Sequence, residues 1–163
     1  MVRPLFRTRI KFCGLTRAGD VRLAGELGVD AVGFIFAPDS PRRIAPMAAR
    51  GLRDALAPLV DAVALFMDNS MDEIREAIAH ARPTVLQFHG NEDDEFCRRF
   101  GLPYLKGIGL RDAGAGLNGR MLHSRYPHAA GFVLDGHASG EPGGSGQRLD
   151  IATIPADMSK PFV

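Results

Sequence analysis

The sequence lacks the features that would place it in a membrane, on nucleic acid or in an oxidising compartment. It has no apolar run near the roughly 20 residues that a transmembrane helix needs. Its 20 basic and 19 acidic residues leave a formal net charge of +1, which gives no reason to expect nucleic acid or an anionic membrane as a partner. Because two cysteines do not make a disulfide framework, we expect a reduced, cytoplasmic protein.

The sequence also lacks the short motifs that bind nucleotides and metals. No G-x-G-x-x-G follows the first strand-like segment, so a dinucleotide-binding sheet is not indicated. No G-K-[ST] follows the glycine-rich stretch at 139–147, which excludes a Walker-type phosphate loop. No second His or Cys lies at ligand spacing from His89, and we expect no metal.

The first ten residues, MVRPLFRTRI, are basic and contain no acidic residue, as many targeting segments do. They have neither an apolar core nor a small-residue cleavage site, and we interpret them as an extension before the first strand. A length of 163 residues fits one domain with a substantial core.

Strand-like and helix-like segments alternate along the chain. The strand-like segments are 9–13, 30–36, 60–67, 84–90, 102–110 and 129–136, with the start of a seventh at 160–163. The helix-like segments are 16–28, 46–57, 71–81, 91–101 and about 112–125. We expect Thr16 and Ser70 as N-caps and Gly28 as a helix stop. This alternation predicts a parallel sheet built from βα units.

Polar residues interrupt one face of several predicted strands. The positions are Lys11, Cys13, Gln87, His89, Lys106 and Asp135. Side chains two positions apart on a strand share a face, so Lys11 lies with Cys13, and Gln87 with His89. An open, doubly wound sheet covered by helices would need both faces apolar, whereas a (β/α)8 barrel accepts polar residues that point inward at its mouth. The pattern therefore favours an α/β fold of the TIM-barrel type.

Cys13 is either core filling or a reactive group. A lone buried cysteine is more often a small hydrophobe. Cys13 ends its strand beside Gly14, however, and the Lys11 ammonium on the same face could stabilise a thiolate. Cys97 has neither feature, and we expect it in the core.

Asp135 and Arg42 also have two interpretations. Asp135 could cap the turn that follows its strand, or it could be a buried carboxyl group whose raised pKa lets it act as an acid. A thiolate base and a carboxylic acid on either side of a small substrate would suit proton transfer. Arg42, in the loop SPRR (40–43), is either solvated or paired with a substrate carboxylate.

The glycine-rich loop and His89 give weaker signals. Backbone N–H groups of the loop at 139–147 could approach a phosphate, but a flexible lid has the same composition. For His89 alone, a structural hydrogen bond is the simplest interpretation.

Four motifs occur in a fixed order: KFCGLTRAGD, GVDAVGFIFAPDSPRRIAP, LQFHGNED and LDGHASGEPGGSGQRLD. From about residue 9 to the end, their order and spacing resemble the phosphoribosylanthranilate isomerase family of tryptophan biosynthesis. The resemblance implies a (β/α)8 barrel that needs no cofactor. It also implies conversion of N-(5-phosphoribosyl)anthranilate into 1-(2-carboxyphenylamino)-1-deoxyribulose 5-phosphate by an acid–base Amadori rearrangement.

The resemblance assigns roles to individual residues. Cys13, in K-x-C-G, matches the family's general base, and Asp135 matches its general acid. The acid would open the ribose ring by protonating its oxygen, and the base would then remove the C2′ proton of the Schiff base. Arg42 would contact the anthranilate ring and its carboxylate. The residues expected to bind substrate are Lys11, Arg42, Gln87, His89, Gly143 and Gly144.

The sequence departs from the family pattern in two places. It has Asp150-Ile151 where the family usually has a Trp after the Asp. Family members also continue through a seventh strand with a Gly-Gly loop and an eighth with a Ser-Ser-Gly loop, and those loops hold the substrate phosphate. We therefore expect residues 1–163 to form a single barrel domain that lacks its last one to two βα units and binds phosphate weakly, as part of a longer chain or a truncated product.

Other functions stay open at this point. One is a catalytically silent barrel fragment that only binds a ligand or partner, with dimerisation through its open edge. Another is a different sugar-phosphate isomerase, although a Cys and Asp pair rather than two aspartates argues against the histidine-pathway relative. The expected partner is a small-molecule substrate, with no nucleic acid or membrane, in a monomer or homodimer.

Overall fold

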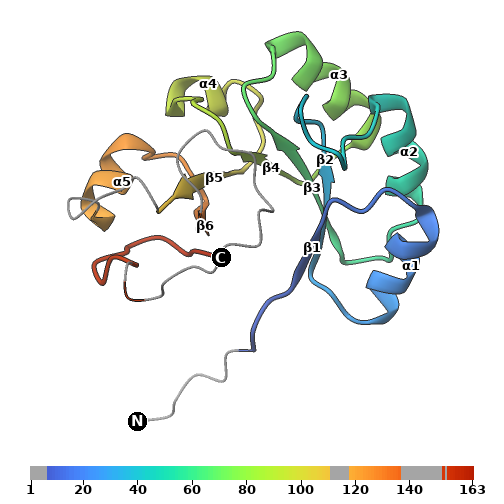
Figure 1. Cartoon of the computed structure of the whole chain (residues 1–163), viewed down its shortest axis with the longest axis horizontal. Helices are drawn as coiled ribbons and strands as arrows, with labels where there is room; N and C mark the ends of the chain where they lie inside the picture. Colours follow the sequence, from blue (N-terminus) through green and yellow to red (C-terminus); the bar gives the residue numbers. More distant parts are fainter. Residues whose placement is uncertain (1–6, 111–117, 137–151, 153) are drawn as a thin grey trace.

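The computed structural model describes residues 7–110, 118–136, 152 and 154–163. Within them, six strands alternate with five helices (Figure 1). The strands are β1 (Lys11–Cys13), β2 (Ala31–Ile35), β3 (Asp61–Phe66), β4 (Val85–Phe88), β5 (Tyr104–Gly109) and β6 (Gly131–Asp135). The helices are α1 (Ala18–Glu26), α2 (Pro46–Asp54), α3 (Met71–Ala81), α4 (Asp94–Arg98) and α5 (Gly119–Arg125). The predicted alternation is confirmed, and each element lies inside its predicted range.

The strands pair in the order in which they occur in the chain. The sheet runs β1-β2-β3-β4-β5-β6, and every neighbouring pair is parallel. The helices form an arc on the outside of the strands (Figure 1). A doubly wound sheet would reverse its strand order at a switch point and carry helices on both faces. The observed order is therefore that of a (β/α) barrel, as predicted.

The outer face of the sheet carries the main apolar core. Phe88 on β4 contacts Phe96 and Phe100 of the α4 region, with ring centroids 6.3 and 6.0 Å apart. Phe66, its neighbour on β3, lies 5.8 Å away and is fully buried. Burying one such side chain stabilises the fold by about 1.5–3 kcal/mol. The helices are thus held to the sheet by aromatic contacts on this face.

The inner face holds smaller and more polar residues. One level of it contains Cys13, Gly33, Val63 and Val85, which are neighbours in the strand register. The next level contains Ile35, Leu65, Gln87 and Leu105. The predicted alternation of an apolar outer face with a partly polar inner face is confirmed at these positions, and Lys106 is an exception described below.

The helix ends follow local sequence signals in two of three predicted cases. Ser70 begins α3 with a capping box, in which its hydroxyl accepts from the Glu73 backbone and the Glu73 carboxylate accepts from the Ser70 backbone. Gly28 follows the end of α1 with a φ of 78°, as expected of a glycine stop. The prediction for Thr16 is wrong, because α1 starts later and Arg17 takes the N-cap position without a side-chain bond. None of the helices in the described residues is long and apolar enough to cross a bilayer.

The end of the chain returns to the sheet beside β6. The Phe132 backbone donates to the Pro161 carbonyl (3.0 Å) and accepts from the Val163 amide (2.9 Å), so the predicted start of a strand at 160–163 pairs as a short bridge. Lys160 Nζ donates to three backbone carbonyls just after α5. They are those of Tyr126, Pro127 and Ala129, at 3.2, 2.6 and 2.6 Å. This lysine fixes the turn between α5 and β6.

The capping box gives a stability prediction. Ser70→Ala removes the hydroxyl that accepts from the Glu73 backbone, and we expect it to lower the free energy of unfolding by about 1 kcal/mol. Thr16→Ala is the matched control, because Thr16 is exposed and caps no helix. Its effect should stay within about 0.5 kcal/mol. Urea unfolding measures both, and equal losses in the two variants would contradict the assigned caps.

Candidate active site at the strand ends

A cavity of about 580 Å³ opens at the carboxyl ends of the strands. Six of the eight predicted site residues line it. They are Lys11, Cys13, Arg42, Gln87, His89 and Asp135. The other two, Gly143 and Gly144, lie outside the described residues. Parallel strands place their carboxyl ends at one rim, so residues far apart in the sequence meet there.

The loop after β2 forms one wall of this cavity. Residues 37–42 all line it, and Arg42 reaches from the loop to β1, where its Nη1 donates to the Cys13 carbonyl at 3.0 Å. The arginine passes close over Gly14, which has a φ of 80° and where an added Cβ would lie 2.9 Å from Arg42 Nη1. A glycine at this position therefore allows the guanidinium to lie at the edge of the cavity beside Cys13.

Space next to Cys13 depends on Gly33. An added Cβ at Gly33 would lie 2.8 Å from Cys13 Sγ and 3.2 Å from Lys11 Cε. Both side chains thus extend over this glycine on the inner face, which confirms that they share a face. The thiol is half-buried and open to the cavity.

Gln87 and His89 form a contact inside the barrel. Gln87 Nε2 lies 2.6 Å from His89 Nε2, so the amide donates to an unprotonated imidazole nitrogen. Gln87 is buried at 2% exposure, and its Oε1 has no hydrogen-bond partner among the described residues. The His89 ring packs over Gly107 of β5, where an added Cβ would lie 2.8 Å from the ring.

The second cysteine behaves as predicted. Cys97 is fully buried within α4, among the apolar residues between helix and sheet. Burial raises the pKa of its thiol to about 12, because the thiolate would lose its hydration. Cys97 is therefore a core residue and carries no thiolate near neutral pH.

Of the six polar strand positions predicted from the sequence, Lys106 is the one that does not line the cavity. It is in register with Phe88, so it points to the outer face, where its Nζ lies 3.0 Å from Glu92 Oε2. Its grouping with the inner polar residues was wrong, because a count of alternate positions does not say which face a strand turns inward.

Sequence reasoning also missed Asp68. This residue lines the cavity and lies two residues after the end of β3, so the rule for strand ends could have found it. The described residues contain no group of three or more His, Cys, Asp or Glu side chains that could hold a metal ion.

Comparisons with known proteins point to one family. The family model "PRAI: N-(5'phosphoribosyl)anthranilate (PRA) isomerase" matches residues 10–162. The N-(5'-phosphoribosyl)anthranilate isomerase of Xanthomonas campestris pv. campestris (strain 8004) is 58% identical over 166 residues, which cover 100% of this chain and 75% of the relative.

Solved structures give the same result. Phosphoribosyl anthranilate isomerase from Thermus thermophilus superposes with a TM-score of 0.75 at 37% identity, covering 90% of this chain and 69% of that one. A complex of this isomerase with reduced 1-(o-carboxyphenylamino)-1-deoxyribulose 5-phosphate superposes with a TM-score of 0.67 at 31% identity, covering 79% and 65%. A further match is to monomers generated from the dimeric Thermotoga maritima enzyme.

Gly107→Ala should move the His89 ring, because the new methyl group would occupy the space of the imidazole. We expect shifted His89 imidazole resonances in ¹H–¹⁵N spectra of the folded variant. Gly51→Ala in α2 is the control, since an added Cβ there meets nothing within 4 Å. Unchanged His89 resonances in Gly107→Ala would contradict the packing described.

The two thiols should differ in reactivity. Iodoacetamide at about pH 8 should alkylate Cys13 in the native protein and leave Cys97 unmodified, because a thiol with a pKa of about 12 is almost fully protonated there. Peptide mass mapping measures the sites, and unfolding in urea should expose both. Modification of Cys97 in the folded protein would refute its placement in the core.

Proposed function

Because the chain belongs to the N-(5'-phosphoribosyl)anthranilate isomerase family, we propose that the cavity at the strand ends is its active site, with Cys13 as base and Asp135 as acid. The chain is an isomerase of tryptophan biosynthesis. It converts N-(5'-phosphoribosyl)anthranilate into 1-(2-carboxyphenylamino)-1-deoxyribulose 5-phosphate by an acid–base Amadori rearrangement. The assignment of residues rests chiefly on one observation, that both groups line one cavity from opposite ends of the sheet.

The reaction needs an acid and a base in turn. A carboxylic acid at Asp135 protonates the ribose ring oxygen, and the bond from C1′ to that oxygen breaks to give a protonated Schiff base. A thiolate at Cys13 then takes the C2′ proton, and the resulting enolamine tautomerises to the ketone. Each proton transfer by a positioned group accelerates such a step by about 10²- to 10⁴-fold.

Lys11 and Arg42 supply the positive charge of the site. The Lys11 ammonium shares the inner face with Cys13. The Arg42 guanidinium, fixed by the Cys13 carbonyl, suits the planar carboxylate of the anthranilate ring, because its N–H groups can bond both oxygens. The carboxylate would thereby be bound within reach of the base.

Gln87 and His89 are proposed to orient the substrate. Gln87 is buried on the inner wall, and its free Oε1 can accept a hydrogen bond from a substrate hydroxyl. The contact between the amide and the imidazole fixes the His89 ring, so both groups present a defined set of donors and acceptors. Gly143 and Gly144 remain candidates for the phosphate, as the motif match implies.

The wider setting is also part of the proposal. The small-molecule substrate is the partner that the family implies, and the six continuous strands support a single barrel domain over residues 1–163. A monomer or a homodimer fits, since a relative is described as dimeric. A biosynthetic role and two free cysteines support a cytoplasmic location.

Removing either proposed proton-transfer group should abolish most of the activity. Cys13→Ala and Asp135→Asn are each expected to lower kcat by about 10²- to 10⁴-fold while the protein stays folded. The measurement is the consumption of N-(5'-phosphoribosyl)anthranilate under saturating substrate.

Two variants serve as controls. Cys97→Ala removes a thiol from the apolar core between α4 and the sheet, and Asp72→Asn removes a carboxylate that is 95% exposed on α3. Both should keep kcat within about twofold. Near-native kcat in Cys13→Ala or Asp135→Asn would rule out the corresponding role. A wild-type chain that binds the reduced product analogue without turnover would instead favour a silent binding barrel.

A further inference from the structure

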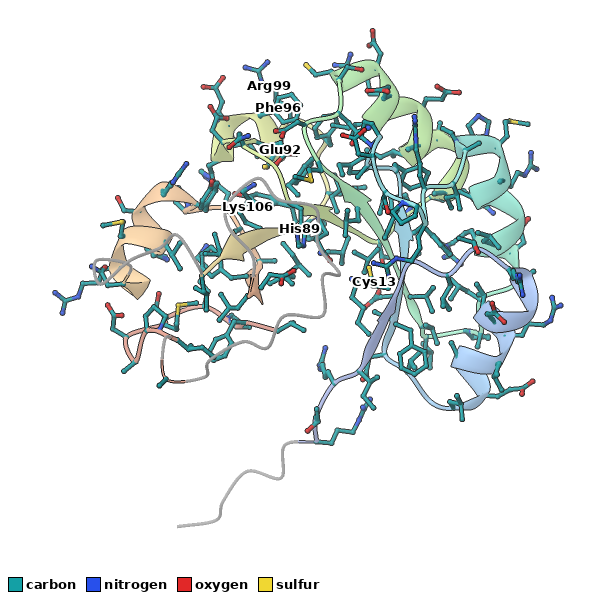
Figure 2. All side chains as sticks on the ribbon, in the orientation of Figure 1. Cys13, His89, Glu92, Phe96, Arg99 and Lys106 are labelled. Atoms are coloured by element: carbon teal, nitrogen blue, oxygen red, sulfur yellow. The ribbon has the colours of Figure 1, made fainter. Side chains whose placement is uncertain are left out.

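Lys106 and Glu92 form a buried ion pair that the proposed proton transfers do not use. Lys106 Nζ lies 3.0 Å from Glu92 Oε2, and the two side chains are 2% and 3% exposed. Figure 2 labels Glu92, Lys106, His89 and Cys13, which follow one another from the region of α4 toward β1. Because Lys106 is in register with Phe88 of the outer face and its Nζ bonds the carbonyl next to His89, the pair lies behind the part of the cavity wall that carries His89.

The surroundings of the pair are apolar. Lys106 is in register with Phe88 on one side and Phe132 on the other, and its Nζ lies 5.7 Å from the Tyr126 ring centroid. Taking two charges out of water costs several kcal/mol each, and apolar residues of similar volume often stabilise a core as well or better. Stability alone is therefore a poor explanation for a lysine and a glutamate here.

Each partner instead holds the backbone of a loop that lines the cavity. Lys106 Nζ donates to the Gly90 carbonyl at 2.6 Å, directly after His89. Glu92 Oε1 accepts from the Asp68 amide at 2.8 Å, in the loop that follows β3. The pair consequently connects β5 to the loops that follow β4 and β3.

These two loops pack so closely that small shifts in one reach the other. Asp68 has a left-handed φ of 54°, and its Oδ1 accepts from the Asn91 amide at 2.7 Å. An added Cβ at Gly90 would overlap the Asp68 carboxylate and lie 2.7 Å from the Asp68 nitrogen. His89 itself is anchored to β3, since its amide donates to the Phe66 carbonyl at 2.9 Å. The positions of Asp68 and His89 in the cavity wall are thus coupled.

We propose that the Lys106–Glu92 pair is a positioning device for the active site, which fixes His89 and Asp68 in the geometry that the substrate needs. The proposal rests on the assignment of the cavity as the active site. Lys106 and Glu92 do not line the cavity and act only through the Gly90 carbonyl and the Asp68 amide. A misplacement of about 1 Å in such groups can lower activity by about 100-fold.

A double variant separates positioning from stability. Lys106→Met or Glu92→Met alone leaves an unpaired buried charge, and we expect a clear fall in Tm. Lys106→Met with Glu92→Met removes both charges, so most of the lost Tm should return. The Gly90 carbonyl and the Asp68 amide stay unheld in the double variant, so its kcat/KM should remain about 10- to 100-fold below wild type. If the single variants do not fold, the double variant carries the test.

Two controls match the double variant in different respects. Arg99→Met breaks an exposed ion pair of 2.7 Å between Arg99 and Glu95 at α4, the helix that follows Glu92. This variant should leave kcat/KM unchanged. Lys160→Met removes a lysine that also donates to backbone carbonyls, but after α5, and it should lower Tm without changing kcat/KM. A double variant that regains wild-type kcat/KM together with its Tm would overturn the proposal.

A measurement on the ligand-free protein tests this positioning role separately from the proposed roles of Cys13 and Asp135. The backbone amides of Asp68 and His89 should shift in ¹H–¹⁵N spectra of the ligand-free double variant, and the Asp68 amide should exchange faster. These changes should occur even if Cys13 and Asp135 have other roles. Asp68 and His89 resonances that match the wild type would overturn the proposal whatever the activity.

Discussion

Parallel pairing of each strand with the next aligns the carboxyl ends of all six strands along one rim. The peptide groups of a parallel ladder fix this alignment, because a shift by one residue would turn every side chain to the other face. The rim therefore collects the last residues of strands that are far apart in the chain. Cys13 from β1, His89 after β4 and Asp135 from β6 meet at one cavity for this reason.

Hydrogen bonds between successive strand ends then hold the rim in shape. Arg42 ties the loop after β2 to the Cys13 carbonyl. Asn69, after β3, donates to the Phe36 carbonyl after β2 at 3.2 Å. The Lys106–Glu92 pair continues this series from β3 to β5, and the Leu110 amide, bonded to the Asp135 carbonyl, extends it to β6. The chemistry of the inner face is supported by these polar contacts around the strand ends.

Much of the fold and most of the described site could be predicted from the sequence, because they follow from periodic patterns. Alternating segments predicted a parallel sheet of βα units, and polar residues on one strand face favoured a barrel over a doubly wound sheet. The spacing of Gln87 and His89 predicted that they share a face. Lys106 could not be placed, since its outward orientation depends on the register with Phe88, which belongs to a different strand. Asp68 could have been predicted, since it directly follows the strand-like segment 60–67 and therefore falls at the rim. Thr16 failed as a cap because the chain stays extended through Arg17 before α1 begins.

Gly33 and Gly107 lie directly under the thiol and the imidazole. There is consequently no spare volume between each glycine and the side chain above it, and a larger residue at either position must displace the thiol or the imidazole. Pro38 and Asp39, by contrast, are exposed and border the cavity from a loop, so side chains of another size fit there without moving the sheet.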